Sequence, residues 1–376
     1  MGSDTVTLRP PVALPLADSI RIEVRAASAT YCVQIAAGAI ATLGRLLDDV
    51  RAPVRRFIVS TPPVWQLHGD AVAGITNEDP ILLPDGERHK NVATVLRIYD
   101  ALIRASADRA TCLIALGGGV VGDVVGFAAA TYLRGVPVVQ VPTTLLAQVD
   151  SAIGGKTGVN HPLGKNLIGS YHQPLAVLVD PLLLGTLPRR EFRAGLYEAI
   201  KYGVIASRRL FERIREDLPK LFARDPAALV PMIAECCRIK ADVVAEDERE
   251  AGPRRALNFG HTGGHALEAV TKYRRFRHGE AVAYGMLVAA ELGVRRGTFT
   301  LGDRAAVAAL IAKMGPLPPI ADLPVSDLLQ AIARDKKVVG GRLHFVLPAS
   351  IGSTQVVTDM TSEELAEALV AIGVRR

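Results

Sequence analysis

Two histidines lie four residues apart in the segment NFGHTGGHALEA, residues 258–269. Four residues is slightly more than one turn of an α-helix, so His261 and His265 share a face if this segment is helical. That spacing lets a helix present two imidazoles to one metal ion. The comparable metalloprotease signature has a glutamate directly after the first histidine, where this sequence has Thr262. A metal site is therefore a hypothesis, and it lacks the general base of a hydrolytic zinc centre.

A glycine-rich segment, residues 112–127 (CLIALGGGVVGDVVGF), has the pattern of a strand, a tight turn and a helix. Gly117, Gly119 and Gly122 match the G-x-G-x-x-G spacing, which lets a phosphate approach the backbone at a helix N-terminus. The ordinary dinucleotide fold also places an acidic residue about 20 residues further on, where this chain has Gln140. The segment indicates phosphate binding outside the standard Rossmann pattern, with tight packing of the glycines as the alternative.

A dense polar segment follows at residues 143–174, TTLLAQVDSAIGGKTGVNHPLGKNLIGSYHQP. It contains Lys156 and Lys165 among five glycines. Two lysines on glycine-rich connecting backbone suit a polyanion better than a hydrophobic core, although a solvated loop is the other interpretation.

Short apolar runs alternate with helical stretches up to about residue 185, including a helix expected at 90–106. The runs are nearly continuous in apolar residues, as in strands buried on both faces. They are residues 55–60, 80–84, 112–116, 136–142 and 176–180. This alternation predicts an α/β domain with a largely parallel, Rossmann-like sheet.

The apolar period changes after that point to one typical of helices. Helices are expected at 188–206, 229–246, 261–270, 279–296, 304–314, 326–334 and 361–372. Thr361 and Glu364 form a capping box for the last of these helices, and a short β segment is expected at 342–348. We therefore expect an α/β domain at 1–186 and a mainly helical domain at 187–376, with a ligand between them.

Composition restricts the class of protein. A chain of 376 residues with 49% hydrophobic and 22% charged residues is typical of globular proteins and long enough for two domains. The net charge of +6 suits either nucleic acid or an acidic small molecule. Aromatic residues are only 5% and do not interleave with the basic groups, so we expect no nucleic-acid partner.

Targeting signals and cysteine usage favour the cytoplasm. Residues 1–18 lack a basic start followed by an apolar block and are expected to be a loose extension, not a secretory signal. Asp123 and Arg134 interrupt the longest apolar stretch, so no membrane span is expected. The four cysteines show no CxxC spacing, which favours reduced, buried thiols.

Six motifs in a fixed order resemble those of a known family. They are GGGVVGDVVGFAAATYLRG, VPTTLLAQVDSAIGGKTGVNHPLGKN, EAIKYG, NFGHTGGHALEA, HGEAVAYGM and RDKK. Together they resemble the 3-dehydroquinate synthases, within the sugar-phosphate cyclases, from about residue 20 to the C-terminus. Relatives that cyclise sedoheptulose 7-phosphate or glucose 6-phosphate share the implied dehydroquinate synthase-like fold. The GGKTGVNHPLGKN and GHTGGH motifs are closer to the dehydroquinate type.

The resemblance implies cofactor sites at defined positions. The implied ligands of a zinc or cobalt ion are Glu198, His261 and His278, a set that leaves coordination positions open for substrate. The implied NAD contacts are Asp85, Glu87, Lys90, Gly118, Gly119, Gly122, Asp123, Thr143, Thr144, Lys156, Lys165 and Thr186.

The resemblance also implies a set of substrate-binding groups. They are Arg134, Asp150, Lys156, Asn166, Lys201, Lys240, Arg254, Asn258, His265 and, from the RDKK motif, Lys336 in preference to Lys337. In the family the equivalent of Arg134 acts across a dimer interface, so a homodimer is expected.

The implied reaction converts 3-deoxy-D-arabino-heptulosonate 7-phosphate, a phosphorylated sugar acid, into 3-dehydroquinate and phosphate. It proceeds by transient oxidation with NAD, elimination of phosphate, re-reduction and an internal aldol closure, so the enzyme is a lyase. The alternatives are a related cyclase (epi-valiolone, aminodehydroquinate or deoxy-inosose type) and a metal- and NAD-dependent polyol dehydrogenase.

Three positions depart from the usual motifs of the family. Tyr197 stands where a small residue usually precedes the glutamate ligand, and His89 stands where a tyrosine is frequent. Gly263 replaces a common aromatic residue between the two histidines. We expect Gly263 to destabilise its helix by roughly 1 kcal/mol relative to alanine.

Overall fold

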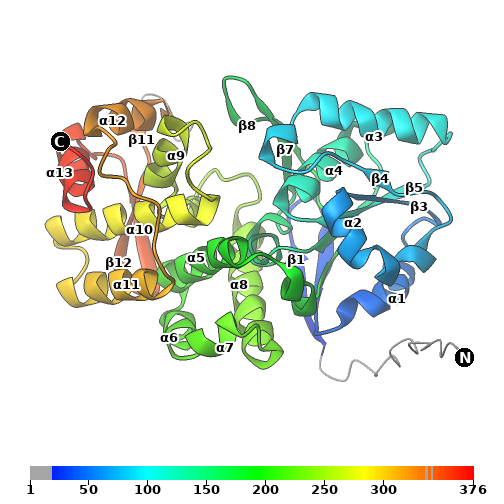
Figure 1. Ribbon diagram of the computed structural model, residues 1–376, viewed down its shortest axis with the longest axis horizontal. Helices are drawn as coiled ribbons and strands as arrows, with labels where there is room; N and C mark the ends of the chain where they lie inside the picture. Colours follow the sequence, from blue (N-terminus) through cyan, green and yellow to red (C-terminus); the bar gives the residue numbers. More distant parts are fainter. Residues whose placement is uncertain (1–18, 335–337, 340–341) are drawn as a thin grey trace, which may run out of the picture.

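The computed structural model describes residues 19–334, 338–339 and 342–376. The N-terminal extension expected at 1–18 and the substrate group expected at Lys336 lie outside the described residues. The fold has an N-terminal α/β domain and a helical C-terminal region, which lie on the right and left of Figure 1.

Seven strands form the sheet of the α/β domain, in the order β1-β2-β9-β6-β5-β3-β4. They are β1 (Ile20–Arg25), β2 (Thr30–Ile35), β3 (Arg55–Ser60), β4 (Ile81–Leu82), β5 (Thr111–Gly117), β6 (Val138–Pro142) and β9 (Ala176–Val179). All neighbours pair in parallel except β1 and β2. The five predicted strands and the largely parallel sheet are confirmed. Strands β1 and β2 were not predicted, and β1 alternates exposed charged and buried apolar residues instead of forming a continuous apolar run.

Helices cover both faces of this sheet because successive residues of each strand point to opposite sides. Phe57 and Val59 of β3 join a core with α3 (Val92–Arg104) and α4 (Gly119–Thr131). Ile58, between them, joins the core on the other face with α1 (Leu43–Asp49) and α2 (Pro62–His68). The predicted helix at 90–106 is α3.

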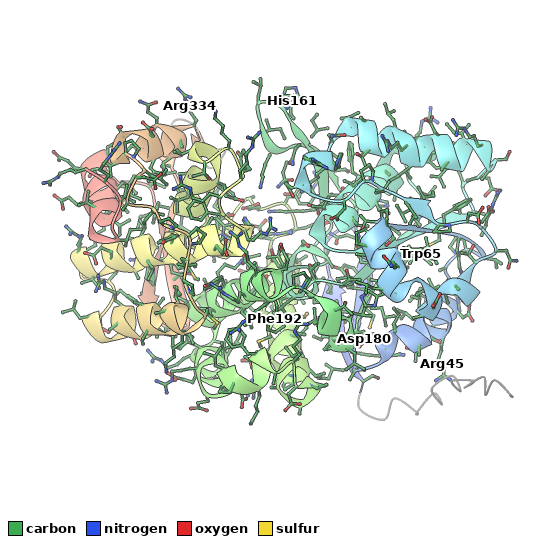
Figure 2. The ribbon with its side chains drawn as sticks, in the orientation of Figure 1. Arg45, Trp65, His161, Asp180, Phe192 and Arg334 are labelled. Atoms are coloured by element: carbon green, nitrogen blue, oxygen red, sulfur yellow. The ribbon has the colours of Figure 1, made fainter. Side chains whose placement is uncertain are left out.

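The polar segment that we expected as connecting backbone contains an antiparallel hairpin, β7 (Lys156–His161) and β8 (Gly164–Tyr171). Val159 and Ile168 pair across the hairpin and join the core beside α4, which anchors its base. Its tip, labelled at His161 in Figure 2, extends upward between the α/β domain and the helical region.

The helical region contains all seven helices predicted after residue 187. Its elements are α5 (Arg189–Ala206), α6 (Arg208–Glu216), α7 (Leu218–Phe222), α8 (Pro226–Glu246), α9 (His261–Val270), α10 (His278–Arg295), α11 (Leu301–Lys313), α12 (Val325–Ala333), α13 (Ser362–Ala371) and the strands β10 (Val338–Val339), β11 (Arg342–Leu343), β12 (Phe345–Ser350) and β13 (Ser353–Val357). The capping box of α13 is confirmed, because Thr361 Oγ1 accepts from the Glu364 amide and Glu364 Oε2 accepts from the Thr361 amide. No helix within the described ranges is long and apolar enough to span a bilayer.

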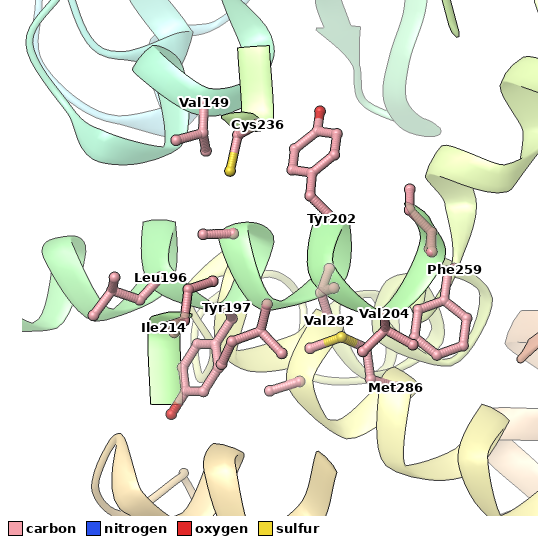
Figure 3. Close-up of a cluster of buried hydrophobic side chains, with 14 of the residues drawn as sticks. Val149, Leu196, Tyr197, Tyr202, Val204, Ile214, Cys236, Phe259, Val282 and Met286 are labelled. Atoms are coloured by element: carbon pink, nitrogen blue, oxygen red, sulfur yellow. The ribbon is translucent and has the colours of Figure 1, made fainter. Parts of the chain in front are cut away.

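Helix α5 lies at the centre of the molecule and is buried over most of its length. Figure 3 shows Tyr197 and Tyr202 leaving this helix on opposite sides, with Tyr197 pointing into the apolar cluster. The unusual residue before Glu198 is therefore a core side chain.

Close packing fixes α10 against its neighbours. A Cβ atom at Gly279 would overlap the carbonyl oxygen of Ala194 in α5, and one at Gly285 would overlap the carbonyl oxygen of Gly260. Gly263 faces the same contact, since a Cβ there would lie 3.2 Å from the Cα of Gly285. At position 263 the helix preference for alanine and the close α9–α10 approach therefore act in opposite directions.

Candidate active site

Three helices bring one carboxylate and two imidazoles together. Glu198 lies in α5, His261 begins α9 and His278 begins α10. The Nε2 atoms of His261 and His278 lie 3.7 Å and 3.4 Å from Glu198 Oε1. Tetrahedral metal–ligand bonds of about 2.0–2.1 Å would place ligand atoms roughly 3.3 Å apart. The spacing therefore suits one transition-metal ion.

The donor chemistry also fits such an ion. Glu198 is fully buried, and neither carboxylate oxygen accepts a well-directed hydrogen bond from the described residues. The charge of Glu198 is compensated only in part, by Lys201 with its Nζ 2.7 Å from Oε2. Since a buried carboxylate without full pairing is costly, a cation bound between Glu198 and the imidazoles would satisfy it.

The orientation of both imidazoles agrees with metal binding. His261 Nδ1 lies 3.1 Å from the carbonyl oxygen of Phe259, and His278 Nδ1 lies 3.3 Å from Glu268 Oε2. Each acceptor favours a proton on Nδ1, which leaves the Nε2 lone pair directed at Glu198 and the metal position.

A second polar cluster adjoins the carboxylate side of this site. Asp150 Oδ1 accepts hydrogen bonds from Lys240 Nζ at 2.5 Å and from Tyr202 Oη at 2.7 Å. Lys240 Nζ also donates to the backbone oxygen of Asp150 at 2.7 Å. Burial opposes ionisation of Asp150, but the charges of Lys240 and Lys201 hold its pKa well below the usual value. The cluster is therefore an ionised carboxylate between buried cations.

The pKa values of the neighbouring donors, Tyr202 and Lys201, are raised, whereas that of Asp150 is lowered. Burial and the charge of Asp150 raise the pKa of Tyr202 well above its ordinary value, so its hydroxyl remains a donor. Burial would lower the pKa of Lys201, but Glu198 and Asp150 together raise it. Lys201 thus stays charged between the group Glu198, His261 and His278 and the Asp150 cluster.

Glu250 connects two residues expected to bind substrate. Its carboxylate accepts from Lys156 Nζ and from Asn258 Nδ2. Burial opposes ionisation of Glu250, but Lys156 and the hydrogen bond from Asn258 keep its pKa below the usual value. A phosphate or carboxylate group of a ligand would compete with Glu250 for the same donors.

Arg254, which was expected to bind substrate, is buried. The residue is 1% exposed, and its guanidinium donates to the backbone oxygens of Glu248 and, at 3.0 Å, Gly154. In this arrangement Arg254 fixes the backbone beside Lys156 and Asn258.

Polar groups also follow the carboxyl ends of three parallel strands. Asp85 follows β4, Gly118 and Gly119 follow β5, and Thr143 follows β6. Thr143 donates its amide to the Gly117 carbonyl oxygen at 2.9 Å, which holds the two turns side by side. Ligands of open α/β sheets bind at this edge, and the N-terminus of α4 adds amide donors for a phosphate.

Lys90 holds several of the expected NAD-binding residues at this edge. The residue is 5% exposed, and its Nζ donates to Asp123 Oδ2 and Asn166 Oδ1, both at 2.5 Å. Burial would lower the pKa of Lys90, but Asp123 and Glu87 raise it. The structure therefore places Asn166 beside expected NAD contacts, away from Lys156 and Asn258.

Glu268 and Lys165 form one of the contacts between the hairpin and the helical region. Lys165 Nζ lies 3.1 Å from Glu268 Oε1 and 3.7 Å from Glu87 Oε1. Burial opposes ionisation of Glu268, but His278 and Lys165 lower its pKa to about 2. Burial would lower the pKa of His278, but Glu268 and Glu198 raise it to about 10, so a metal ion that binds Nε2 would displace a proton.

Comparison with known proteins adds independent information. A family model described as 3-dehydroquinate synthase N-terminal matches residues 80–194, and one described as 3-dehydroquinate synthase C-terminal matches residues 195–338. The chain belongs to the 3-dehydroquinate synthase family. A 3-dehydroquinate synthase of Synechococcus sp. is 46% identical over 367 residues, which cover 94% of this chain and 99% of the relative.

Solved structures extend this family relationship. The structure of 2-epi-5-epi-valiolone synthase from Streptomyces hygroscopicus, with NAD+ and Zn2+ bound, has a TM-score of 0.83 and 28% identity, covering 97% of this chain and 99% of its own. The structure of 2-deoxy-scyllo-inosose synthase, complexed with carbaglucose-6-phosphate, NAD+ and Co2+, has a TM-score of 0.84, 24% identity and coverage of 94% and 99%. At that identity, the second comparison supports the fold alone.

Some expected residues of the family site lie apart from these clusters. Arg134 is exposed at a turn with a positive φ of 69°, and Asp85 is exposed after β4. Thr186 Oγ1 lies 3.0 Å from His68 Nε2 at the far end of the strand edge. None of the described contacts joins these three residues to the metal cluster.

Three residues that take part in these side-chain clusters were not identified in the sequence. Tyr202 directly follows Lys201 in the motif EAIKYG, and Glu250 precedes Arg254 by four positions. Glu268 is seven residues after His261 and three after His265, so the helical period already placed it on their face. Tyr202 is four residues after Glu198 in α5 and shares its face in the same way, whereas Glu250 had no periodic signal.

Proposed function

We propose that this chain is a 3-dehydroquinate synthase, a lyase that converts 3-deoxy-D-arabino-heptulosonate 7-phosphate into 3-dehydroquinate and phosphate in the shikimate pathway. The observation that carries the proposal is the convergence of Glu198, His261 and His278 beside the Lys201–Asp150–Lys240 cluster. A polyhydroxy substrate with two anionic groups needs both a cation for its hydroxyls and buried positive charge. The names of the relatives in the same family support this choice over other cyclases.

The proposed cofactors are NAD and one zinc or cobalt ion. The ion would be held by the two imidazoles and Glu198, and NAD by the residues at the carboxyl edge of β4, β5 and β6. The cyclase structure with NAD+ and Zn2+ bound, 28% identical to this chain, supports this pair of cofactors. Bound NAD supplies a hydride acceptor that is regenerated, and the bound ion supplies polarisation of a substrate hydroxyl oxygen.

The residues around the ion have separate proposed roles. Asp150 accepts hydrogen bonds from substrate hydroxyls and stays ionised because Lys240 and Lys201 compensate its charge. Lys156 and Asn258 bind an anionic group of the substrate, which displaces Glu250. His265 lies beside both ligand imidazoles, with ring centroids 5.5 Å and 6.0 Å away, and donates to the leaving phosphate.

We propose that the two sides of the boundary near residue 186 bind different ligands. Residues 19–186 would bind NAD and residues 187–376 would bind the metal and most of the substrate. Two observations support this: the strand edge with the glycine turn lies wholly before the boundary, and all three proposed metal ligands lie after it.

A homodimer is proposed from the outer face of α3. Val92, Leu96 and Ile103 are 43%, 52% and 63% exposed and recur on one side of this helix. Leu133, 40% exposed, extends the apolar surface at the turn that carries Arg134. A second copy of the chain would cover this surface and bring Arg134 to the partner's site.

We also propose that the enzyme works in the cytoplasm. All four cysteines are free thiols, and Cys112, Cys236 and Cys237 are buried. Burial raises the pKa of Cys112 to about 12, as expected of an unreactive packing residue. Detection of the enzyme in a secreted fraction would contradict this placement.

A panel of sugar phosphates tests the proposed substrate. Purified protein with zinc and NAD is given the heptulosonate 7-phosphate, sedoheptulose 7-phosphate or glucose 6-phosphate, and released phosphate is measured. We expect release from the heptulosonate alone. Release from another sugar phosphate without release from the heptulosonate would reassign the chain to a different cyclase.

A further inference from the structure

Glu268 lies between a metal ligand and the α/β domain. Its side chain is buried in α9, with 2% exposure. One carboxylate oxygen, Oε2, lies 3.3 Å from His278 Nδ1, and the other, Oε1, lies 3.1 Å from Lys165 Nζ. Each oxygen therefore serves a different part of the molecule.

The two ring nitrogens of His278 face different carboxylates. Nε2 lies 3.4 Å from Glu198 Oε1, on the metal side, and Nδ1 faces Glu268. A carboxylate that accepts from Nδ1 fixes the tautomer, orients the ring and makes Nε2 a stronger ligand. His261 obtains comparable support from the backbone oxygen of Phe259, whereas His278 obtains it from the side chain of Glu268.

The contact with Lys165 reaches the strand edge. Lys165 is carried by β8 of the hairpin, and its Nζ lies 3.7 Å from Glu87, in the turn that follows β4. The same ammonium lies 4.4 Å from the ring centroid of Tyr273, beyond the end of α9. Lys165 is therefore held jointly by the α/β domain and by the helix that carries Glu268.

We propose that Glu268 is a positioning residue that orients His278 toward the metal and, through Lys165, couples metal binding to NAD binding. NAD at the strand edge would hold the hairpin, the hairpin would hold Lys165 against Glu268, and Glu268 would hold the imidazole. The inference rests on the proposed function, because it uses the metal and NAD sites proposed above. By linkage, any gain in zinc affinity from NAD must equal the gain in NAD affinity from zinc.

The test measures zinc binding directly, without substrate. The zinc Kd is determined by competition with a chromophoric chelator, with and without saturating NAD, for the whole chain and for Glu268→Gln and Glu268→Ala. Glutamine keeps an oxygen that can accept from His278 Nδ1 but loses the charge that binds Lys165. Cobalt-substituted protein adds a geometric readout, the visible absorption of the ion.

Glu291→Gln is the matched control. Glu291 lies on α10, the helix of His278, is 12% exposed and pairs with Arg295 at 2.9 Å and Arg304 at 2.7 Å. The substitution removes two partly buried ion pairs from the same helix without touching Glu198, His261 or His278.

We expect Glu268→Ala to raise the zinc Kd by about 10- to 100-fold and to change the cobalt spectrum. Glu268→Gln should raise the zinc Kd less. Saturating NAD should lower the zinc Kd of the unmodified chain by about 5-fold or more, and this effect should disappear in both variants. Glu291→Gln should retain both the zinc affinity and the NAD effect.

Two results would overturn the inference. The first is an unchanged zinc Kd in a folded Glu268→Gln or Glu268→Ala protein, and the second is an NAD effect that persists in both variants. Phosphate release by the unmodified chain is measured separately. Absent phosphate release with the expected zinc results would reject the proposed substrate and leave the role of Glu268 supported.

Discussion

At the scale of single residues, the site works by giving each ionisable group a charged or polar partner. Glu198 faces the two imidazoles and Lys201, and Asp150 faces Lys240 and Tyr202. Since removing one member of a buried cluster leaves the others uncompensated, single substitutions here should have large and separable effects.

His278→Ala should remove the metal. The substitution deletes one of the three proposed ligands and leaves Glu198 and His261 to hold the ion. Elemental analysis after exhaustive dialysis measures the bound zinc. His161→Ala, at the exposed hairpin tip, is the control and should retain it. One zinc per chain in dialysed His278→Ala would refute this ligand assignment.

Tyr202→Phe should lower kcat with little change in zinc content. The hydroxyl donates to Asp150 at 2.7 Å, and a hydrogen bond to a buried charge contributes about 1.5–3 kcal/mol, equivalent to roughly 10-fold or more in rate. Tyr197→Phe is the control, because its hydroxyl lies on the opposite side of α5 and contacts Arg193 at 3.4 Å. Equal kcat values for the two variants would contradict a positioning role for Tyr202.

The sequence predicted the identity of these residues better than their contacts. Its motifs named Glu198, Lys201 and Asp150, but no pattern in one chain shows that Glu250 would lie between Lys156 and Asn258. Those contacts depend on how separate elements pack, which spacing along the chain does not encode.

At the scale of elements, the proposed metal site depends on close helix packing. Gly279 and Gly285 let α10 approach α5 and the start of α9, and this approach brings together the three helices that carry the proposed ligands. The hydrophobic period predicted these helices to within a few residues, but the requirement for glycine appears only when the helices are placed together.

Gly285→Ala should destabilise the fold by about 3 kcal/mol or more, because the new methyl group would overlap backbone atoms that cannot move independently. Gly302→Ala is the control in α11, where the nearest atom to a new Cβ, Thr300 Oγ1, is 3.8 Å away. That variant should be stabilised by up to about 1 kcal/mol. Urea unfolding measures both, and equal stabilities for the two variants would contradict the packing argument.

Glu364 should stabilise α13 in a pH-dependent way. Arg296 binds both carboxylate oxygens at 2.7 Å, and the hydrogen bonds from Arg296 and the Thr361 amide lower the pKa of Glu364 from 4.5 to about 2. A lowered folded-state pKa means that the stabilisation is complete above pH 4.5 and is lost as the pH falls toward about 2.

The measurement compares the chain with Glu364→Gln by urea unfolding across this pH range. The variant should lose about 1 kcal/mol near neutral pH, and the difference should shrink as acid is added. Glu367→Gln, which removes a more exposed pair with Arg295, should have a smaller effect. A difference that grows at low pH would contradict the assignment.

At the scale of the whole molecule, the sequence patterns did not predict the order of the strands in the sheet. Continuous apolar runs predicted β3, β4, β5, β6 and β9 and a largely parallel sheet, because strands of this composition are typically buried on both faces. The patterns did not place β2 beside β9 or extend the sheet with β1. They also missed the hairpin at 156–171, whose glycines suggested connecting backbone.

The proposed dimer is tested by the outer face of α3. Leu96→Glu places a charge in the middle of the apolar stripe and should shift the chain toward monomers, because burying an unpaired carboxylate is costly. Analytical ultracentrifugation at several concentrations measures the shift. Leu67→Glu, at a 56% exposed leucine of α2 outside the stripe, should leave the association unchanged. A Leu96→Glu protein that associates as the unmodified chain does would place the interface elsewhere.

We propose that NAD is used and regenerated within each turnover, so that this chain is a lyase and not a dehydrogenase. The most direct measurement incubates the zinc-loaded chain with the heptulosonate 7-phosphate and NAD at well below the substrate concentration, following phosphate and absorbance of NADH together. We predict many phosphates released per NAD with no net gain of NADH. NADH accumulating in step with consumed substrate, without phosphate release, would contradict the account.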